Sequence, residues 1–256
     1  MKRPITFLLI MALVATATAQ DAASAASAVF SPKRIVKTNL AGYVLLVPNL
    51  NYEQWTGKKT SVGLLSGYKI ASTIKVNALG SLDGEDQRYT SDVEPSGLFV
   101  NPYFRYYPKE TFKGFYVEAF ARYFNYDYVV PYDYEKNGGT IRAALNGRAS
   151  GIGGGLVFGV QFAMASRLFL DINMGYGIAV GDAHIETSDP NLEREDYEKI
   201  KRNIEKYQDD PDVQVFLLGD VLKNPDARAT DTMAEADFRN KIFPMLRAGI
   251  ALGYAF

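Results

Sequence analysis

Large apolar side chains alternate with small or charged ones along residues 243–256, at the end of the chain. Such alternation places the two kinds of side chain on opposite faces of a β-strand. The same pattern recurs in earlier segments, each about as long as the roughly 9–11 residues that a tilted strand needs to cross a membrane. The pattern therefore predicts an all-β fold, namely an antiparallel up-and-down transmembrane β-barrel.

Eight segments carry this pattern and are the predicted strands. They are residues 35–46, 49–56, 60–70, 97–107, 114–126, 150–164, 168–180 and 243–256. Three of the connections are long, polar loops, at residues 71–96, 127–149 and 181–242. Short turns on the periplasmic side and long loops outside the cell are typical of outer-membrane barrels. The tight turn at residues 47–49 does not fit this rule, because its place in the series falls on the side of the long loops.

The alternation also predicts which side chains point into the barrel. In residues 168–180, Asp171 and Asn173 share the inner face, whereas the large apolar side chains share the outer one. An Arg or Lys facing the middle of the lipid would cost about 2–4 kcal/mol, so the charges are expected inside. The predicted inward charges are Lys37, Glu53, Lys69, Arg105, Glu118, Arg122, Asp171 and Arg247.

Two interpretations of these inward charges stay open. In the first, they neutralise one another in a packed polar core, since an eight-stranded barrel is filled by its own side chains. A simple hairpin around residues 108–113 would place Arg105 opposite Glu118, and Asn101 opposite Arg122. In the second, they form a narrow ion path or an anion site, because five basic groups face three acidic ones. Inward glycines opposite bulky aromatic side chains likewise fit either complementary packing or a small ligand cavity.

The N-terminus predicts export. Lys2 and Arg3 precede an apolar stretch, and small residues at 17–19 form a cleavage site, so residues 1–19 are a predicted signal peptide. Residues 20–33, rich in Ala and Ser, are predicted to be a flexible leader, and residues 34–256 the barrel domain. No apolar run reaches the roughly 20 residues of a membrane-spanning helix.

Composition narrows the class of protein further. Removing Lys2 and Arg3 with the signal peptide leaves 26 basic residues against 29 acidic ones, a net charge of −3 that excludes a basic nucleic-acid-binding protein. The chain has no cysteine, so an exported form has no disulfides to stabilise it. Seventeen Tyr, 15 Phe and 22 Gly are typical of strands with aromatic girdles and tight turns.

The loop at residues 181–242 differs from the rest. Residues 191–208 space their apolar side chains for one face of an exposed amphipathic helix, and residues 213–218 form a further apolar patch. Asp209, Asp210 and Asp212 match no calcium-binding loop, and no metal site or cofactor is predicted. The three long loops are the predicted surface for an extracellular ligand.

Catalysis is a minor alternative. The one histidine of the chain, His184, lies near Asp182, Glu186 and Ser188 in sequence. A barrel enzyme that modifies lipid A would need that histidine oriented by a carboxylate and next to a hydroxyl. A histidine in a polar loop is more often simply solvated, so no catalytic residue is predicted.

Several of these features resemble a known group of proteins. The signal peptide, the opening at residues 37–40, the turn at residues 48–50 and the final series Leu252, Tyr254 and Phe256 resemble the small outer-membrane barrels grouped around OmpA, OmpX and OmpW. More narrowly, they resemble an uncharacterised barrel family, a domain of unknown function, common in Bacteroidota. The resemblance implies that the final series is recognised by the barrel-insertion machinery. Because the sequence ends with the last predicted strand, we expect no OmpA-type peptidoglycan-binding domain.

Together these features predict an integral outer-membrane protein of a Gram-negative bacterium. Its expected role is structural or surface-interacting, with a largely filled polar lumen, and its expected partners are outer-membrane lipid and lipopolysaccharide. The alternative is a porin-like narrow channel or a carrier for a small apolar or anionic molecule.

Overall fold

The computed structural model describes residues 32–75, 92–136, 139–207 and 224–256. The predicted signal peptide, nearly all of the predicted leader, the apolar patch at residues 213–218 and the aspartates at 209, 210 and 212 lie outside these ranges. Within the described parts of the chain, no helix combines the length and the apolar character that a membrane span requires.

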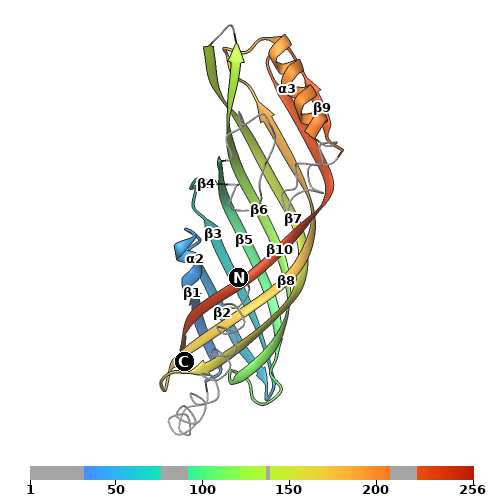
Figure 1. Cartoon of the computed structure of the whole chain (residues 1–256). Helices are drawn as coiled ribbons and strands as arrows, with labels where there is room; N and C mark the ends of the chain where they lie inside the picture. The colour runs from blue at the N-terminus through green and yellow to red at the C-terminus, as the bar shows by residue number, and fades with distance from the viewer. Residues whose placement is uncertain (1–31, 76–91, 137–138, 208–223) are drawn as a thin grey trace, which may run out of the picture.

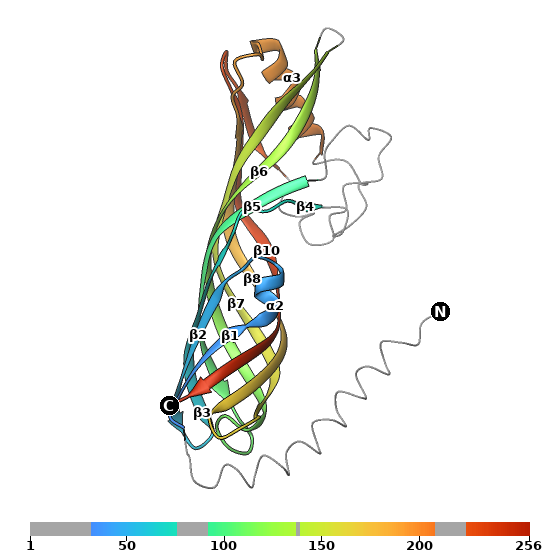
Figure 2. The same ribbon diagram turned by 90° about the vertical axis from the view of Figure 1, so that its left-hand side faces the viewer.

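Eight of the described strands form a closed antiparallel ring (Figures 1 and 2). In ring order they are β1 (Arg34–Asn39), β2 (Asn49–Gly57), β3 (Thr60–Lys69), β5 (Asp92–Tyr106), β6 (Gly114–Lys136), β7 (Gly139–Ala163), β8 (Leu168–Thr187) and β10 (Ala234–Ala255). The ring closes where β1 pairs with β10, from Ile35 opposite Ala255 to Asn39 opposite Ala251. Two short strands are not part of the ring: β4 (Ile74–Lys75) pairs with β5, and β9 (Asp226–Ala229) pairs with β10. The predicted all-β, up-and-down arrangement is confirmed.

The first predicted strand, residues 35–46, is wrong in its second half. β1 ends at Asn39, and Leu40–Val44 form a short helix, α2. The Asn39 side chain caps this helix by accepting a hydrogen bond from the Ala41 N–H at 3.1 Å. The connection between β1 and β2 is therefore residues 40–48 and not a tight turn, which removes the exception to the alternation of short and long connections.

The predicted loop at residues 127–149 is also wrong. β6 and β7 continue through it as a paired hairpin up to Lys136 opposite Gly139. β8 similarly extends to Thr187, and β10 begins at Ala234, so both reach into the predicted loop at 181–242. These extensions stand beyond the ends of β1, β2 and β3 (Figure 1). Their polar residues led to the prediction of loops in place of strands.

The burial of side chains follows the predicted alternation. Along β8, Phe169, Asp171 and Ala179 are buried inside the ring, whereas Met174 is 65% exposed and Ile178 is 53% exposed on the outside. Large apolar side chains are exposed on the outside of every ring strand except the short β1, and charged side chains lie within the ring. The ring is therefore apolar outside and partly polar inside.

The predicted helix in the last long connection is confirmed as α3 (Arg194–Tyr207). Tyr197 and Ile200 of α3 pack with Leu192 and Ala234, and Leu145 of β7 packs against this cluster. Because these strand residues point to the inner side, α3 covers the inner face of the tall wall formed by β7 and β10.

Candidate functional site

Six charged side chains meet inside the ring, toward the end with the short turns. They are Lys37, Glu53, Arg105, Glu118, Asp171 and Arg247, one each from β1, β2, β5, β6, β8 and β10, and we call them the charge cluster. None is more than 7% exposed. All six belong to the eight predicted inward charges.

The charge cluster is held by direct ion pairs. Lys37 Nζ lies 2.5 Å from a Glu53 carboxylate oxygen and 2.7 Å from one of Asp171. Arg105 donates to Glu118 at 2.7 Å, to Asp171 at 2.7 Å and to Glu53 at 3.1 Å. Arg247 donates to the other oxygen of Glu118. Three cations face three carboxylates, so the cluster is formally neutral.

Neutral side chains complete this network. Ser61 of β3 donates to Glu53 at 2.5 Å, and Gln161 of β7 accepts from Arg105 at 3.0 Å and from Lys37 at 3.1 Å. With these two residues, every strand of the ring contributes to one hydrogen-bonded layer. Tyr107 donates to Glu53 at 2.8 Å and Tyr116 donates to Asp171 at 2.6 Å. Sequence reasoning missed these neutral partners, although the inward parity of Gln161 on its strand is readable.

Aromatic rings pack around the charge cluster. The Arg105 guanidinium lies 4.0 Å from the centre of the Tyr116 ring and 4.8 Å from that of Tyr103. Glycines make room for these rings, because a Cβ added at Gly63 would lie 2.2 Å from the Tyr103 ring, and one at Gly159 would lie 2.4 Å from the Tyr116 ring. The expected packing of inward glycines against bulky aromatic side chains is confirmed at Gly63 and Gly159.

The other two predicted inward charges do not join the charge cluster. Arg122 Nε donates to Asn101 Oδ1 at 2.8 Å, as the predicted hairpin register requires, and its guanidinium lies 4.9 Å from the centre of the Phe99 ring. Lys69 Nζ donates to the Ile70 carbonyl at 2.8 Å and to Ser72 Oγ at 2.5 Å. Alternation in sequence predicts the face of the strand on which a side chain lies but not its level along the ring axis. Arg122 and Lys69 lie at a different level from the charge cluster.

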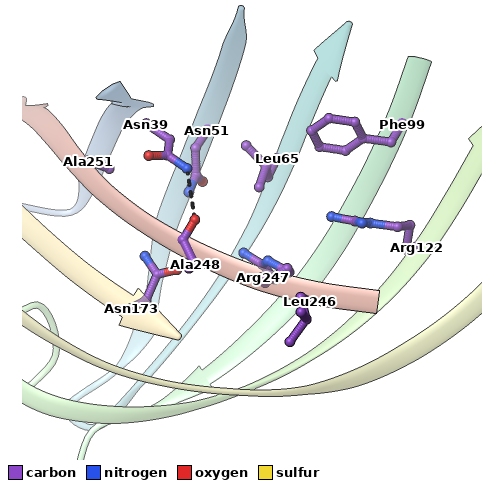
Figure 3. A pocket seen from close by; sticks show the side chains of 10 residues that line it. All are labelled: Asn39, Asn51, Leu65, Phe99, Arg122, Asn173, Leu246, Arg247, Ala248 and Ala251. Carbon is purple, nitrogen blue, oxygen red and sulfur yellow. Dashed lines mark hydrogen bonds between the residues drawn. The ribbon is translucent and has the colours of Figure 1, made fainter. Parts of the chain in front are cut away.

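A cavity of about 120 Å³ lies inside the ring, next to the charge cluster (Figure 3). The polar residues that line it are Asn39, Asn51, Arg122, Asn173 and Arg247, and the apolar ones are Leu65, Phe99, Leu246, Ala248 and Ala251. Asn39 bridges to β10 at the edge of this cavity, where its Nδ2 donates to the Ala248 carbonyl at 3.4 Å and its Oδ1 accepts from the Ile250 N–H at 3.2 Å.

His184 lies elsewhere, on the outer face of β8. Its Nδ1 is 2.8 Å from Asp237 Oδ1 on β10, and its Nε2 is 3.5 Å from a Glu186 oxygen. The hydrogen bond that His184 donates to Asp237, together with Glu186, raises the pKa of His184 above its ordinary value. The predicted neighbour Asp182 instead accepts from the Asn240 N–H at 2.8 Å.

The partner of His184 could not be read from the sequence. A bulge between Phe238 and Lys241 shifts the register of β10, and this shift sets Asp237 opposite His184. In the described part of the chain, carboxylates and no hydroxyl contact the imidazole ring, so the acid and base of a catalytic triad are present without a nucleophile.

The predicted insertion signal lies on the outer face at the closing edge of the ring. Leu252, Tyr254 and Phe256 are 40%, 49% and 48% exposed, whereas the intervening Gly253 and Ala255 are buried. Tyr254 stands opposite Val36 in the β1–β10 pair, so this series is part of the ring closure.

Comparison with known proteins gives one family match. The model of a family described as "Protein of unknown function (DUF3575)" matches residues 5–208. That range covers most of the chain, from within the predicted signal peptide through α3, and the chain belongs to this family. A comparison with curated proteins finds no match.

Proposed function

We propose that this member of the DUF3575 family is an integral outer-membrane β-barrel protein with a sealed lumen and a structural or surface-interaction role. The proposal includes export by a cleaved signal peptide at residues 1–19 and insertion by the machinery that recognises Leu252, Tyr254 and Phe256. The features that the sequence shares with the small barrels around OmpA, OmpX and OmpW support this location, as they support an origin in Bacteroidota.

The outward face of the ring supports residence in a membrane. Monomeric soluble proteins rarely expose a contiguous apolar patch of more than a few hundred Å², whereas here seven of the eight ring strands expose large apolar side chains on the outside. On β8 this surface runs from Leu168 to Val180. With a rise of about 3.3 Å per residue and a tilt of about 40°, this stretch spans about 30 Å, close to the thickness of a hydrocarbon core.

Charged outward side chains begin just past this apolar belt. Asp127 and Arg148 pair on β6 and β7 at 2.8 Å, and His184 and Asp237 pair on β8 and β10 at the same level. Outward charges at the edge of the belt, with none within it among the described residues, suit a surface in contact with lipid headgroups. Lipopolysaccharide is therefore the partner that we propose for this edge.

The observation that carries the proposal of a sealed lumen is the neutral charge cluster. Together with its neutral partners Ser61 and Gln161, the cluster includes a side chain from every strand of the ring. Side chains that pack and pair across the whole ring leave no continuous water path at that level. The tall wall with α3, at the end with the long connections, is then the surface available for an extracellular ligand.

Planar-bilayer recordings test the seal. The refolded mature protein should pass no steady current, whereas a known porin that is refolded and recorded in the same way should pass one. A steady, voltage-independent current from the folded wild-type chain would show instead that the lumen conducts, and would favour the narrow channel.

A further inference from the structure

The interior of the ring carries an excess of positive charge on one side of the charge cluster. Among the described residues of the ring strands, the inward carboxylates are Glu53, Glu118 and Asp171, and all three belong to the cluster. Arg122 and Lys69 are therefore inward cations without a carboxylate in contact. A cation in a confined polar space attracts an anion more strongly than the same cation in bulk water.

Arg122 is the cation that is free to bind a ligand. Its Nε is used by Asn101 and one face of its guanidinium lies over Phe99, but the described residues give its two terminal nitrogens no hydrogen-bond acceptor. Guanidinium groups bind carboxylates and phosphates through these nitrogens, often with two parallel hydrogen bonds. Lys69, by contrast, already donates to Ile70 and Ser72.

The cavity next to Arg122 has the size and the lining of a small binding site. Arg247 and three asparagines line it together with Arg122, and Leu65 and Phe99 provide an apolar portion (Figure 3). Its volume of about 120 Å³ compares with the roughly 150 Å³ of a cavity that holds benzene, so a molecule of about six heavy atoms fits. Two cations, amide groups and an apolar patch together suit a short organic acid.

We propose that this cavity binds a small organic carboxylate, with the carboxylate on Arg122 and Arg247 and a short hydrocarbon portion against Phe99 and Leu65. Arg247 keeps its bond to Glu118, so it contributes charge without leaving the charge cluster. Asn39, Asn51 and Asn173 can donate further hydrogen bonds from their amide groups. This binding site rests on the proposed function only because it requires the folded ring.

The edge of β10 offers a route to this cavity. Residues 251–255 of β10 pair with β1, but residues 241–250 pair with β8 alone. Next to the paired residues, the Asn39 side chain takes the place of a backbone partner by bonding to the backbone of Ala248 and Ile250. Leu246 and Ala248 belong to the outer face of β10 and still line the cavity, so it reaches the seam between β1 and β10.

Calorimetric titration of the refolded mature protein in detergent tests the site, with sodium butyrate as the probe. The wild type should bind about one butyrate per chain in a saturable way, and butanol, which lacks the charge, should not bind. Arg122→Gln should weaken butyrate binding at least about tenfold, because a hydrogen bond to a charged group is lost. Lys69→Gln should change the affinity less than about twofold, since Lys69 does not line the cavity.

Four results would overturn the site. They are no saturable binding of butyrate, binding of butanol with equal affinity, an unchanged affinity in Arg122→Gln, or an equal loss in Lys69→Gln, which would indicate non-specific attraction. Binding of inorganic phosphate without butyrate would overturn the assignment to an organic acid. Each preparation is first shown to be folded by its heat-modifiable migration, so a failure of this site is distinct from a failure of the outer-membrane assignment.

Discussion

Single residues in the interior are under a strong electrostatic constraint. Moving a charged group out of water costs several kcal/mol even after the protein relaxes, and this cost is offset only if the charge has good partners. Arg105 meets all three carboxylates of the charge cluster, and Gln161 and the tyrosines occupy further hydrogen-bonding positions. Removing one member therefore leaves its partners buried with an uncompensated charge.

Glu118→Gln tests this dependence. The change removes the carboxylate that Arg105 and Arg247 share, so the free energy of unfolding should fall by about 3–5 kcal/mol. Unfolding by urea can be followed through the fluorescence of Trp55, the one tryptophan of the chain. Asp127→Asn is the matched control, because that carboxylate pairs with Arg148 on the exposed outer face and should matter by less than about 1 kcal/mol. Equal effects of the two changes would contradict a buried cluster.

The outer pair of His184 and Asp237 predicts a pH dependence. Their hydrogen bond raises the pKa of His184 and lowers that of Asp237. The contribution of His184 to stability is therefore complete below about pH 6.5 and is lost as the pH rises through its raised pKa. The contribution of Asp237 is complete above about pH 4 and is lost as the pH falls through its lowered pKa. The pair should be most stabilising between these limits.

The titration of His184 can be measured directly by NMR, since it is the one histidine of the chain. In Asp237→Asn its pKa should fall toward the ordinary value, because the largest cause of the shift is gone. Asp182→Asn is the control, since that carboxylate accepts from Asn240 and not from the imidazole. A pKa of His184 that stays raised in Asp237→Asn would refute the pairing.

Alternation along the sequence was enough to predict which residues point inward, because a strand has a period of two. It could not predict which inward residues meet, since the level of each residue along the axis depends on strand tilt and register. For this reason Arg122 was grouped with residues that it does not contact. The neutral partners Ser61, Gln161 and Tyr107 carry no charge that would single them out in a sequence.

At the scale of elements, the sequence predicted the strands better than their ends. The hairpin at residues 127–149 mixes polar residues with apolar ones, and such a mixture alone does not distinguish a strand from a loop. The turn at residues 47–49 was misread because an alternating pattern continues from β1 into α2. In contrast, the helical spacing of apolar residues identified α3, whose one apolar face packs on the wall.

Asn39 is the residue on which the first two elements and the ring closure depend. Its side chain caps α2 and bridges to Ala248 and Ile250 of β10. Asn39→Ala should lower the free energy of unfolding by about 1–2 kcal/mol, measured by urea titration. Asn39→Asp keeps the acceptor oxygen and should lose less. A change of less than about 0.3 kcal/mol in Asn39→Ala would show that the bridge contributes nothing to closure.

At the scale of the whole molecule, the ring reverses the usual distribution of side chains. Apolar side chains lie on most of its outside and a neutral layer of charges lies inside, a distribution that suits the membrane location proposed above. Closure through β1 and β10 removes the open sheet edge at the level where they pair, as a barrel in lipid requires. Fold, seal and proposed location all depend on this single division into an outer and an inner face.

Adjacent residues of β8 give the most direct test of that division. Met174 is exposed at the middle of the outer face, and Asn173 points inward into the cavity beside two arginines. Met174→Asp and Asn173→Asp introduce the same charge one residue apart, and the fraction of protein that inserts into lipid vesicles and resists alkaline extraction can be compared. We expect Met174→Asp to insert poorly and Asn173→Asp to insert as the wild type does. Equal insertion of both variants, or a wild-type protein that is freely extracted, would contradict the account.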